Sequence, residues 1–150
     1  MAEIIFRPFV LTDAAAVLAL HNAALSNQWH QEDFLNVLAQ GNCFGVAACR
    51  QNAIIGAVLA QQAQDHADIL TLVVEENSRR QGIGAHLLTA FLAAARQAGI
   101  KNIFLEVAVT NNLASRLYEK LGFICVGQRP GYYQEAGQQV DAKIYHLINS

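Results

Sequence analysis

The sequence has no long hydrophobic run. Its longest uninterrupted apolar stretch, residues 53–60, is eight residues long, whereas a membrane-spanning helix needs about 20. Glu3 and Arg7 flank a short apolar run at the N-terminus, without the longer apolar core of a secretion signal. We therefore expect a soluble, cytoplasmic protein with no membrane partner.

Clustered positive charge is also lacking. The ten Lys and Arg residues are scattered over 150 positions, and the formal net charge is -2. Proteins that bind nucleic acid need a basic patch or stripe that neutralises phosphates. The composition therefore argues against DNA or RNA as a direct ligand.

Cysteine and histidine do not have the spacing of metal ligands. Cys43, Cys49 and Cys125 are odd in number, form no C-x-x-C pair and lie in apolar, strand-like contexts, so we interpret them as buried thiols. The five histidines form no H-E-x-x-H or other paired-ligand pattern. No metal is predicted. No Cys-His pair is local in sequence, so nothing indicates a covalent enzyme intermediate.

Hydrophobic residues are plentiful and evenly spread. They make up 53% of the chain against 15% charged residues, with no Pro/Gly/Ser linker, repeat or low-complexity tract. A chain of this length buries about two-thirds of the surface that it exposes when unfolded. We predict one domain over residues 1–150, as a monomer or a homodimer.

Helix and strand patterns follow one another along the chain. Helices are predicted from a cap at Thr12 or Asp13 to Ala24, and at 31–39, 84–98 and 112–121. Strands are predicted at 4–6, 44–49, 54–61, 69–74, 103–109, 124–126 and 140–147. Short connections between 44 and 74 indicate antiparallel hairpins, and the strand–helix–strand unit around 84–98 indicates parallel neighbours. The predicted fold class is α/β, with a mixed, mostly antiparallel sheet of about six to seven strands and about four helices.

The segment Arg79-Arg80-Gln81-Gly82-Ile83-Gly84 lies where a helix begins. A helix start has unpaired N–H groups and the positive end of the dipole, which suit a phosphate. Gly82 and Gly84 have no Cβ and can adopt positive φ, so an anion can approach the backbone, and the two arginines can hold its oxygens. We interpret the segment as a pyrophosphate site. The G-x-G alone also fits an ordinary strand-to-helix turn.

Two other glycine motifs for nucleotides are absent. The sequence has no G-x-x-x-x-G-K-[ST], and its G-x-G lacks the third glycine and the acidic residue about 20 positions further on that dinucleotide folds use. ATP and NAD are therefore not expected. The hexapeptide fits [QR]-x-x-G-x-[GA] and follows the apolar strand ILTLVV. In both respects it resembles the acetyl-CoA loop of the GNAT N-acetyltransferases.

The resemblance extends over nearly the whole chain. The segment FLEVAVTNNLASRLYEKLGF resembles the family's next strand and second cofactor helix. Within the family, the chain looks most similar to the ribosomal-protein-alanine N-acetyltransferases of the RimI type, through VVEENSRRQGIG, the ending RPGYYQEAG and Trp29. The resemblance implies the GNAT fold and transfer of acetyl from acetyl-CoA to the α-amine of a protein N-terminus, with ribosomal protein S18 as the type substrate. A small-molecule amine as acceptor, or a CoA-binding regulatory domain without turnover, remain alternatives.

The resemblance also implies which residues contact acetyl-CoA. The strand whose backbone contacts the pantetheine arm and the thioester corresponds to Leu72, Val73 and Val74, which also fit an ordinary buried strand. The amides around the pyrophosphate correspond to Arg80, Gln81, Gly82, Ile83, Gly84 and Ala85. Arg79 fills the first motif position or is a solvated charge. Asn111 corresponds to a cofactor-contacting Asn or serves only as a helix cap.

Acetyl transfer needs a proton acceptor and a proton donor, because an ammonium is not a nucleophile and a protonated thiol leaves more readily. Glu106, in the otherwise apolar strand IFLEVAV, corresponds to the proposed base, and Tyr118 to the proposed acid. A carboxylate in such a strand is costly unless it is paired, hydrated or functional. Strand alternation could instead turn Glu106 to solvent, and Tyr118 could be a packed aromatic.

The acceptor groove is implied less specifically. Trp29, Tyr132 and Tyr133 correspond to groove residues, although packing in the core or at the surface fits each of them equally. Ala108 stands where RimI-type enzymes commonly have a basic residue, and Gln134 where they usually have proline. Both departures fall near the implied acceptor side, so they leave the identity of the acceptor open.

Overall fold

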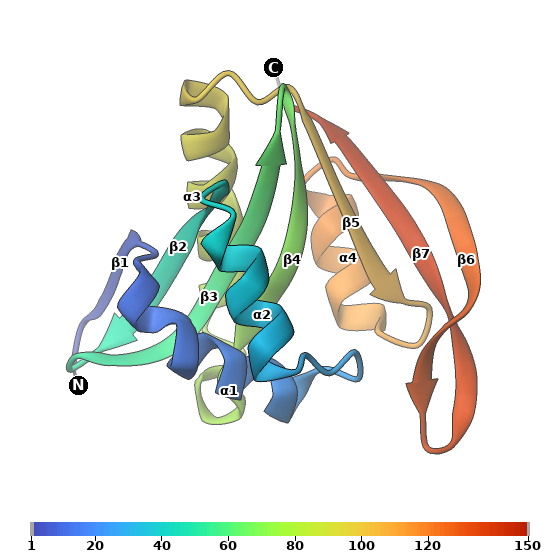
Figure 1. Ribbon diagram of the computed structural model, residues 1–150, viewed down its shortest axis with the longest axis horizontal. Helices are drawn as coiled ribbons and strands as arrows, with labels where there is room; N and C mark the ends of the chain where they lie inside the picture. The colour runs from blue at the N-terminus through green and yellow to red at the C-terminus, as the bar shows by residue number, and fades with distance from the viewer. Residues whose placement is uncertain (1, 150) are drawn as a thin grey trace.

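The computed structural model describes residues 2–149 as one seven-stranded sheet with helices on both faces (Figure 1). The strands are β1 Ile4–Pro8, β2 Cys43–Arg50, β3 Ala53–Ala63, β4 His66–Val74, β5 Asn102–Ala108, β6 Ile124–Glu135 and β7 Gln138–Ile148. The helices are α1 Ala14–Ala24, α2 Gln31–Ala39, α3 Ile83–Gln97 and α4 Asn112–Lys120, with 3-10 turns at Leu11–Asp13 and Glu76–Ser78. The predicted α/β class is confirmed.

The strand order is β1-β2-β3-β4-β5-β7-β6, and every neighbouring pair is antiparallel except β4 and β5. The parallel pair flanks α3, as the strand–helix–strand pattern predicts. The ladder between these two strands covers only His66–Asp68 on β4 and 102–104 on β5. Beyond it the strands diverge, which Figure 1 shows as a wedge that opens away from the top of the view. This wedge positions the site described below.

Alternation along β3 divides the hydrophobic core between the two faces of the sheet. Val58 and Ala60 pack in the cluster that contains the apolar side of α3, whereas Ala57 and Leu59 pack with Val17 of α1 and with α2. The apolar residues of α3 recur at helical spacing and are buried: Leu87, Leu88, Phe91, Leu92 and Ala95. Each large apolar side chain that is fully buried contributes about 1.5–3 kcal/mol relative to exposure. The two clusters together fix α1 and α3 against opposite faces of β3 and β4.

Asp13 is the N-cap residue of α1, one of the two predicted positions, but its side chain makes no capping hydrogen bond to this helix. Its carboxylate instead accepts from the backbone N–H of Val10 at 2.9 Å and pairs with the Arg7 guanidinium at 2.8 Å. Arg7 holds the pKa of Asp13 below its usual range, through a hydrogen bond that outweighs desolvation. Arg7 on β1 therefore holds the Asp13 carboxylate against the 3-10 turn that precedes α1, away from the N–H groups of the helix.

The edge strand β6 is much longer than the predicted 124–126. It runs from Ile124 to Glu135, with register shifts at 125/127 and 129/133. Pro130 and the nearby glycines suggest a loop in the sequence, but an edge strand tolerates proline and bulges. Because β6 is an edge strand, Cys125 is exposed, so the prediction of three buried thiols is wrong at this position. Cys49 is buried and Cys43 is half-buried, and all three are free.

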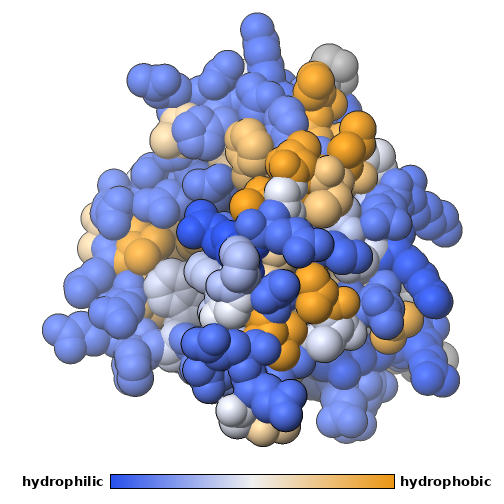
Figure 2. Space-filling model, turned by 90° about the vertical axis from the view of Figure 1, so that its right-hand side faces the viewer, coloured by the Kyte–Doolittle hydropathy of each residue, from blue (hydrophilic) through white to orange (hydrophobic). Residues whose placement is uncertain are grey.

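Figure 2 views the molecule from the β6–β7 side of Figure 1, where polar side chains surround several apolar patches. The two strands expose Ile124, Val126 and Ile148. None of the helices within residues 2–149 is both long and apolar enough to cross a membrane.

Candidate active site

The loop before α3 exposes bare backbone. Gly82 is the N-cap of α3 with φ of +75°, and a Cβ built on it would meet no atom within 4 Å. Arg80 also has a left-handed φ, of +67°, which is uncommon for a residue with a side chain and is typical of functional loops. The first N–H groups of α3 have no acceptor within the helix. The loop thus presents several donors and the positive helix end to one space.

Gly84 plays a different part from the one predicted. It lies inside the first turn of α3 and does not have a positive φ. A Cβ on Gly84 would lie 3.6 Å from Leu117 of α4 and 3.8 Å from Val74 of β4. The second glycine of the motif therefore lies where α3, α4 and β4 approach one another, and of the two glycines Gly82 has the positive φ.

Hydrogen bonds brace this loop from two directions. Arg50, at the end of β2, donates to Ser78 at 3.2 Å and to the side-chain oxygen of Gln81 at 3.1 Å. Ser78 in turn donates to Glu75 at 3.1 Å. The exposed Arg79 donates from Nε to the backbone oxygen of Val74 at 3.1 Å. The loop is therefore tied to two strands, and the side chain of Arg79 is not simply a free solvated charge.

A cavity of about 1020 Å³ lies between this loop and the wedge. Of the residues predicted to contact the cofactor, only Gln81, held by Arg50, does not line it. Those that do are Leu72, Val73, Val74, Arg79, Arg80, Gly82, Ile83, Gly84, Ala85 and Asn111. Polar donors at one end and apolar walls along β4 and α4 fit an anionic group joined to a long, mostly apolar arm.

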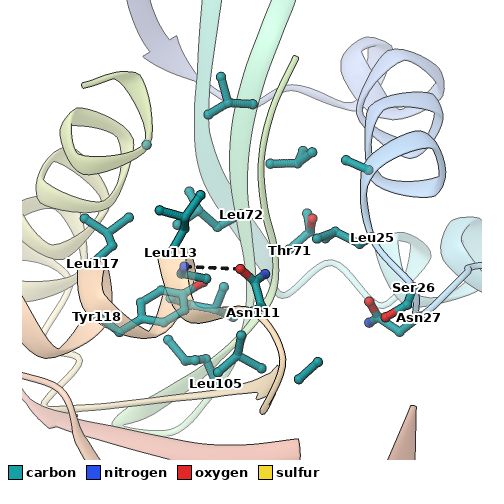
Figure 3. Close-up of a pocket in the computed structure, with 18 of the residues that line it drawn as sticks. Leu25, Ser26, Asn27, Thr71, Leu72, Leu105, Asn111, Leu113, Leu117 and Tyr118 are labelled. Atoms are coloured by element: carbon teal, nitrogen blue, oxygen red, sulfur yellow. Dashed lines mark hydrogen bonds between the residues drawn. The ribbon is translucent and has the colours of Figure 1, made fainter. Parts of the chain in front are cut away.

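Figure 3 shows the side of this cavity formed by α4, with Leu113, Leu117 and Tyr118 near Leu72. The dashed line marks the cap of α4, in which Oδ1 of Asn111 accepts the backbone N–H of Ala114 at 3.2 Å. Asn111 therefore serves as a helix cap and also lines the cavity.

Tyr118 is buried, with 6% of its surface exposed, and its ring packs against Phe123 and Tyr145. It also lines the cavity. Burial raises the pKa of Tyr118, with a smaller contribution from Tyr133. A tyrosine hydroxyl is protonated at neutral pH, and burial keeps this one protonated, so it holds a proton that could be donated.

A second cavity of about 370 Å³ adjoins the first. It brings together Trp29, Tyr132 and Tyr133, the three residues predicted for the acceptor groove. Trp29 is half-buried and packs edge-on against Phe34, Tyr133 is buried, and Tyr132 is 51% exposed. Residues that line both cavities include Asn27, Leu105, Glu106 and Tyr133. A ligand in the first cavity and a ligand in the second would therefore contact each other beside these side chains.

Glu106 lies at this junction. It alternates along β5 with Leu105 and Val107, which are buried in the core, so its side chain points to the opposite face of the sheet. The second cavity lies on that face, and 23% of the surface of the Glu106 side chain is exposed. Oε1 forms an ion pair with Nε of Arg129 at 2.7 Å, and Oε2 is buried without a hydrogen-bond partner among residues 2–149. Alternation thus turns Glu106 away from the core without turning it fully to solvent.

The sequence did not reveal several polar residues of the site. Arg129 lies on β6, which is separated from β5 by β7, so no spacing in the sequence links it to Glu106. Glu135 accepts from Thr110 at 2.8 Å and from Ser26 at 3.0 Å, and so joins three segments at the rim of the larger cavity. No local motif signals either contact, because both depend on how distant segments pack.

The two residues that depart from the RimI pattern lie in different surroundings. Ala108 is buried beside Tyr133 and Ala142 and lines the larger cavity, whereas Gln134 is exposed on β6. Among residues 2–149, no group of three or more His, Cys, Asp or Glu side chains is placed to hold a metal ion.

Comparison with known proteins defines the class. Residues 14–123 match the family model described as "Acetyltransferase (GNAT) family". The chain therefore belongs to this family and is an acetyl-CoA-dependent N-acetyltransferase, as predicted.

Individual relatives are similar over most of the chain. [Ribosomal protein bS18]-alanine N-acetyltransferase of Escherichia coli (strain K12) is 29% identical over 137 residues, which cover 91% of each chain. The crystal structure of the E. coli ribosomal-protein-S18-alanine N-acetyltransferase matches with a TM-score of 0.91 at 24% identity, covering 99% of this chain and 95% of that one. Arabidopsis thaliana NAA60 in complex with acetyl-CoA matches with a TM-score of 0.84 at 25% identity, covering 97% and 98%. The single-domain extent, the oligomeric state, the cytoplasmic location and the lack of nucleic-acid or membrane partners stay predictions.

Proposed function

We propose that this enzyme acetylates the α-amine of a protein N-terminus. The observation that carries the proposal is the meeting of the two cavities at Glu106 and Tyr133, so that an amine entering by the second cavity reaches a group held in the first. The second cavity has aromatic walls, and Tyr132 is half-exposed at its edge, which suits an extended peptide. The name of the E. coli relative, a ribosomal-protein alanine N-acetyltransferase, agrees with this acceptor.

In this proposal the larger cavity holds acetyl-CoA, which supplies an acetyl group activated as a thioester. The backbone of Leu72, Val73 and Val74 borders the pantetheine arm. These residues lie on the part of β4 that has diverged from β5 and does not pair with it. The amides of Arg80, Gly82, Ile83, Gly84 and Ala85 bind the pyrophosphate, whereas Gln81 lies outside this cavity. The left-handed Gly82, the cationic side chain of Arg80 and the start of α3 support this assignment. Asn111 lines the same cavity and keeps the start of α4 in place.

Glu106 and Tyr118 are proposed to move the protons. Glu106 takes a proton from the acceptor ammonium, directly or through a water, because Oε2 is buried and has no other donor among the described residues. The neutral amine then forms the N–C bond while the C–S bond breaks, and Tyr118 gives its hydroxyl proton to the departing sulfur. The proton that the acylated nitrogen sheds as it becomes an amide restores the Tyr118 hydroxyl. The buried, protonated hydroxyl at the wall of the larger cavity supports this role for Tyr118.

A panel of acceptors with an intact-mass readout tests the proposal. One peptide has a free α-amine and no lysine, its matched partner has a blocked α-amine and one lysine, and small polyamines form the third group. We expect one added acetyl group on the first peptide only. Acetylation confined to the lysine peptide or to the small amines would contradict an N-terminal acceptor while leaving the acetyltransferase class intact.

A further inference from the structure

The carboxylate of Glu106 has two oxygens in unlike surroundings. Oε1 is 2.7 Å from Nε of Arg129, whereas Oε2 is buried without a hydrogen-bond donor among residues 2–149. Opposite charges at this distance attract, so the ion pair favours the orientation of Glu106 in which Oε1 faces the guanidinium. A buried carboxylate oxygen with no donor is costly, unless a ligand supplies the missing hydrogen.

Arg129 reaches Glu106 across a whole strand. The register pairs Arg129 with Ala142 of β7, and Ala142 with Ala108 of β5, two residues beyond Glu106. Register partners share one face of a sheet, so the small side chain of Ala142 leaves room for the arginine to pass over β7. The guanidinium also lies 5.3 Å from the centre of the Tyr132 ring, within the range of a cation–π contact. The arginine is therefore held by an anion and by an aromatic face.

We propose that Arg129 is a positioning residue for the reaction: by holding Oε1, it keeps Glu106 turned so that Oε2 faces the junction of the two cavities and accepts the proton of the incoming amine. The inference rests on the proposed function, in which Glu106 is the base. Arg129 lines the second cavity and not the first, so it does not contact acetyl-CoA in this arrangement and acts through Glu106.

The surroundings of Glu106 explain why a cation such as Arg129 is needed to orient its carboxylate. Its charged neighbours in the second cavity are Asp68 and Arg129, and its neutral polar neighbours are Asn27 and the hydroxyls of Tyr132 and Tyr133. Asp68 carries the same charge as Glu106 and Asn27 is neutral, so Arg129 is the cation available there to fix the carboxylate. A glutamate without such a partner keeps more of its side-chain freedom, which would spread Oε2 over several directions.

A double-mutant cycle tests the proposal. The acetylation kinetics of one N-terminal peptide are measured for wild type, Arg129→Gln, Arg129→Lys, Glu106→Gln and both Arg129 changes combined with Glu106→Gln. Arg116→Gln, an exposed arginine on α4, controls for the loss of one surface charge. We expect Glu106→Gln to lower kcat about 100-fold and Arg129→Gln about 10-fold, with the KM for acetyl-CoA within about 2-fold of wild type.

In the Glu106→Gln background, we expect neither change at Arg129 to lower kcat by more than about 2-fold, since groups that act through each other are not additive. An equal loss in both backgrounds would overturn the proposal, as would a rise in kcat/KM on Arg129→Gln, which would mean that Arg129 competes with the acceptor. Arg129→Lys gives the same comparison if the glutamine variant does not fold. Full activity of Glu106→Gln would refute the role of Glu106 as the base. If Glu106→Gln lost activity and Arg129→Gln did not, only the positioning role of Arg129 would be refuted.

Discussion

His21 of α1 and Thr71 of β4 are joined inside the protein by a hydrogen bond of 2.7 Å between Nδ1 and Oγ1. The other ring nitrogen, Nε2, lies 2.7 Å from the backbone oxygen of Asn27. A carbonyl only accepts, so Nε2 carries the proton and Nδ1 accepts from the threonine hydroxyl. His21 is only 1% exposed, and it ties the first helix to the segment whose Asn27 lines both cavities.

The buried imidazole predicts how stability depends on pH. Burial lowers the pKa of His21 below its ordinary value of 6.5, so below that pH the unfolded chain binds the proton more readily than the folded one. The contribution of this group is intact above pH 6.5 and is lost as the pH falls, by at most about 1.4 kcal/mol per pH unit. Urea unfolding at pH 7.5 and 5.5 measures it. His21→Gln should be less stable at pH 7.5 and show a smaller loss on acidification, and an unchanged loss would contradict this account.

Gly82→Val should weaken the binding of acetyl-CoA at least about 10-fold, or 1.4 kcal/mol. Valine is strained at a φ of +75°, and its side chain would occupy the open space beside the loop. Gly41→Val is a matched control, because Gly41 has a φ of +77° and equally open surroundings, and lines neither cavity. Isothermal titration with acetyl-CoA compares them. Equal affinities in the two variants would count against binding at this loop.

Tyr118→Phe should lower kcat about 10- to 100-fold while leaving the affinity for acetyl-CoA nearly unchanged, because it removes only the proton donor. Tyr145→Phe serves as control: this tyrosine is also buried, its hydroxyl bonds Glu119 at 2.7 Å, and it lines neither cavity. Steady-state rates at saturating acetyl-CoA distinguish the two. If both variants lost kcat equally, a general packing effect would replace the proposed acid.

Tyr132→Ala should raise the KM for a peptide acceptor several-fold without changing the KM for acetyl-CoA. Tyr132 lines the second cavity and not the first, so its loss removes aromatic surface on the acceptor side, together with the contacts of Tyr132 to Arg129 and Glu106. Val126→Ala, at another exposed position of β6 outside both cavities, is the control. Initial rates over a range of peptide concentrations give the answer. A matching rise in the KM for acetyl-CoA would show that the two substrates do not enter by separate cavities.

The elements that could be predicted are those with local signals. Apolar spacing predicted α2 at the residues that the structure assigns, and it placed α3 and α4 within one residue at each end. The long β6 could not be predicted, because its pairing with β7 outweighs the local effect of Pro130 and its neighbouring glycines. The capping hydrogen bond expected from the Asp13 side chain does not form for a similar reason, since Arg7 on a different element supplies the stronger partner.

The residues of the candidate site likewise fall into those that the sequence could predict and those that it could not. The loop before α3, Glu106 and Tyr118 could be found because short motifs and an out-of-place carboxylate mark them. Arg129 could not, since its contact depends on the order β5-β7-β6 and on a small residue at position 142. Gln81 fits the motif as well as its neighbours do, yet Arg50 on β2 directs its side chain away from the cavity.

The short parallel ladder between β4 and β5 makes the sheet two half-sheets, β1-β2-β3-β4 and β5-β7-β6, with little backbone continuity between them. Past this seam, the amides of β4 on the side of the wedge have no strand to protect them from exchange with solvent. A molecule that fills the wedge bridges both halves and stiffens the protein as it binds. In the proposed binding mode acetyl-CoA occupies this gap, so the rigidity of the enzyme would depend on its cosubstrate.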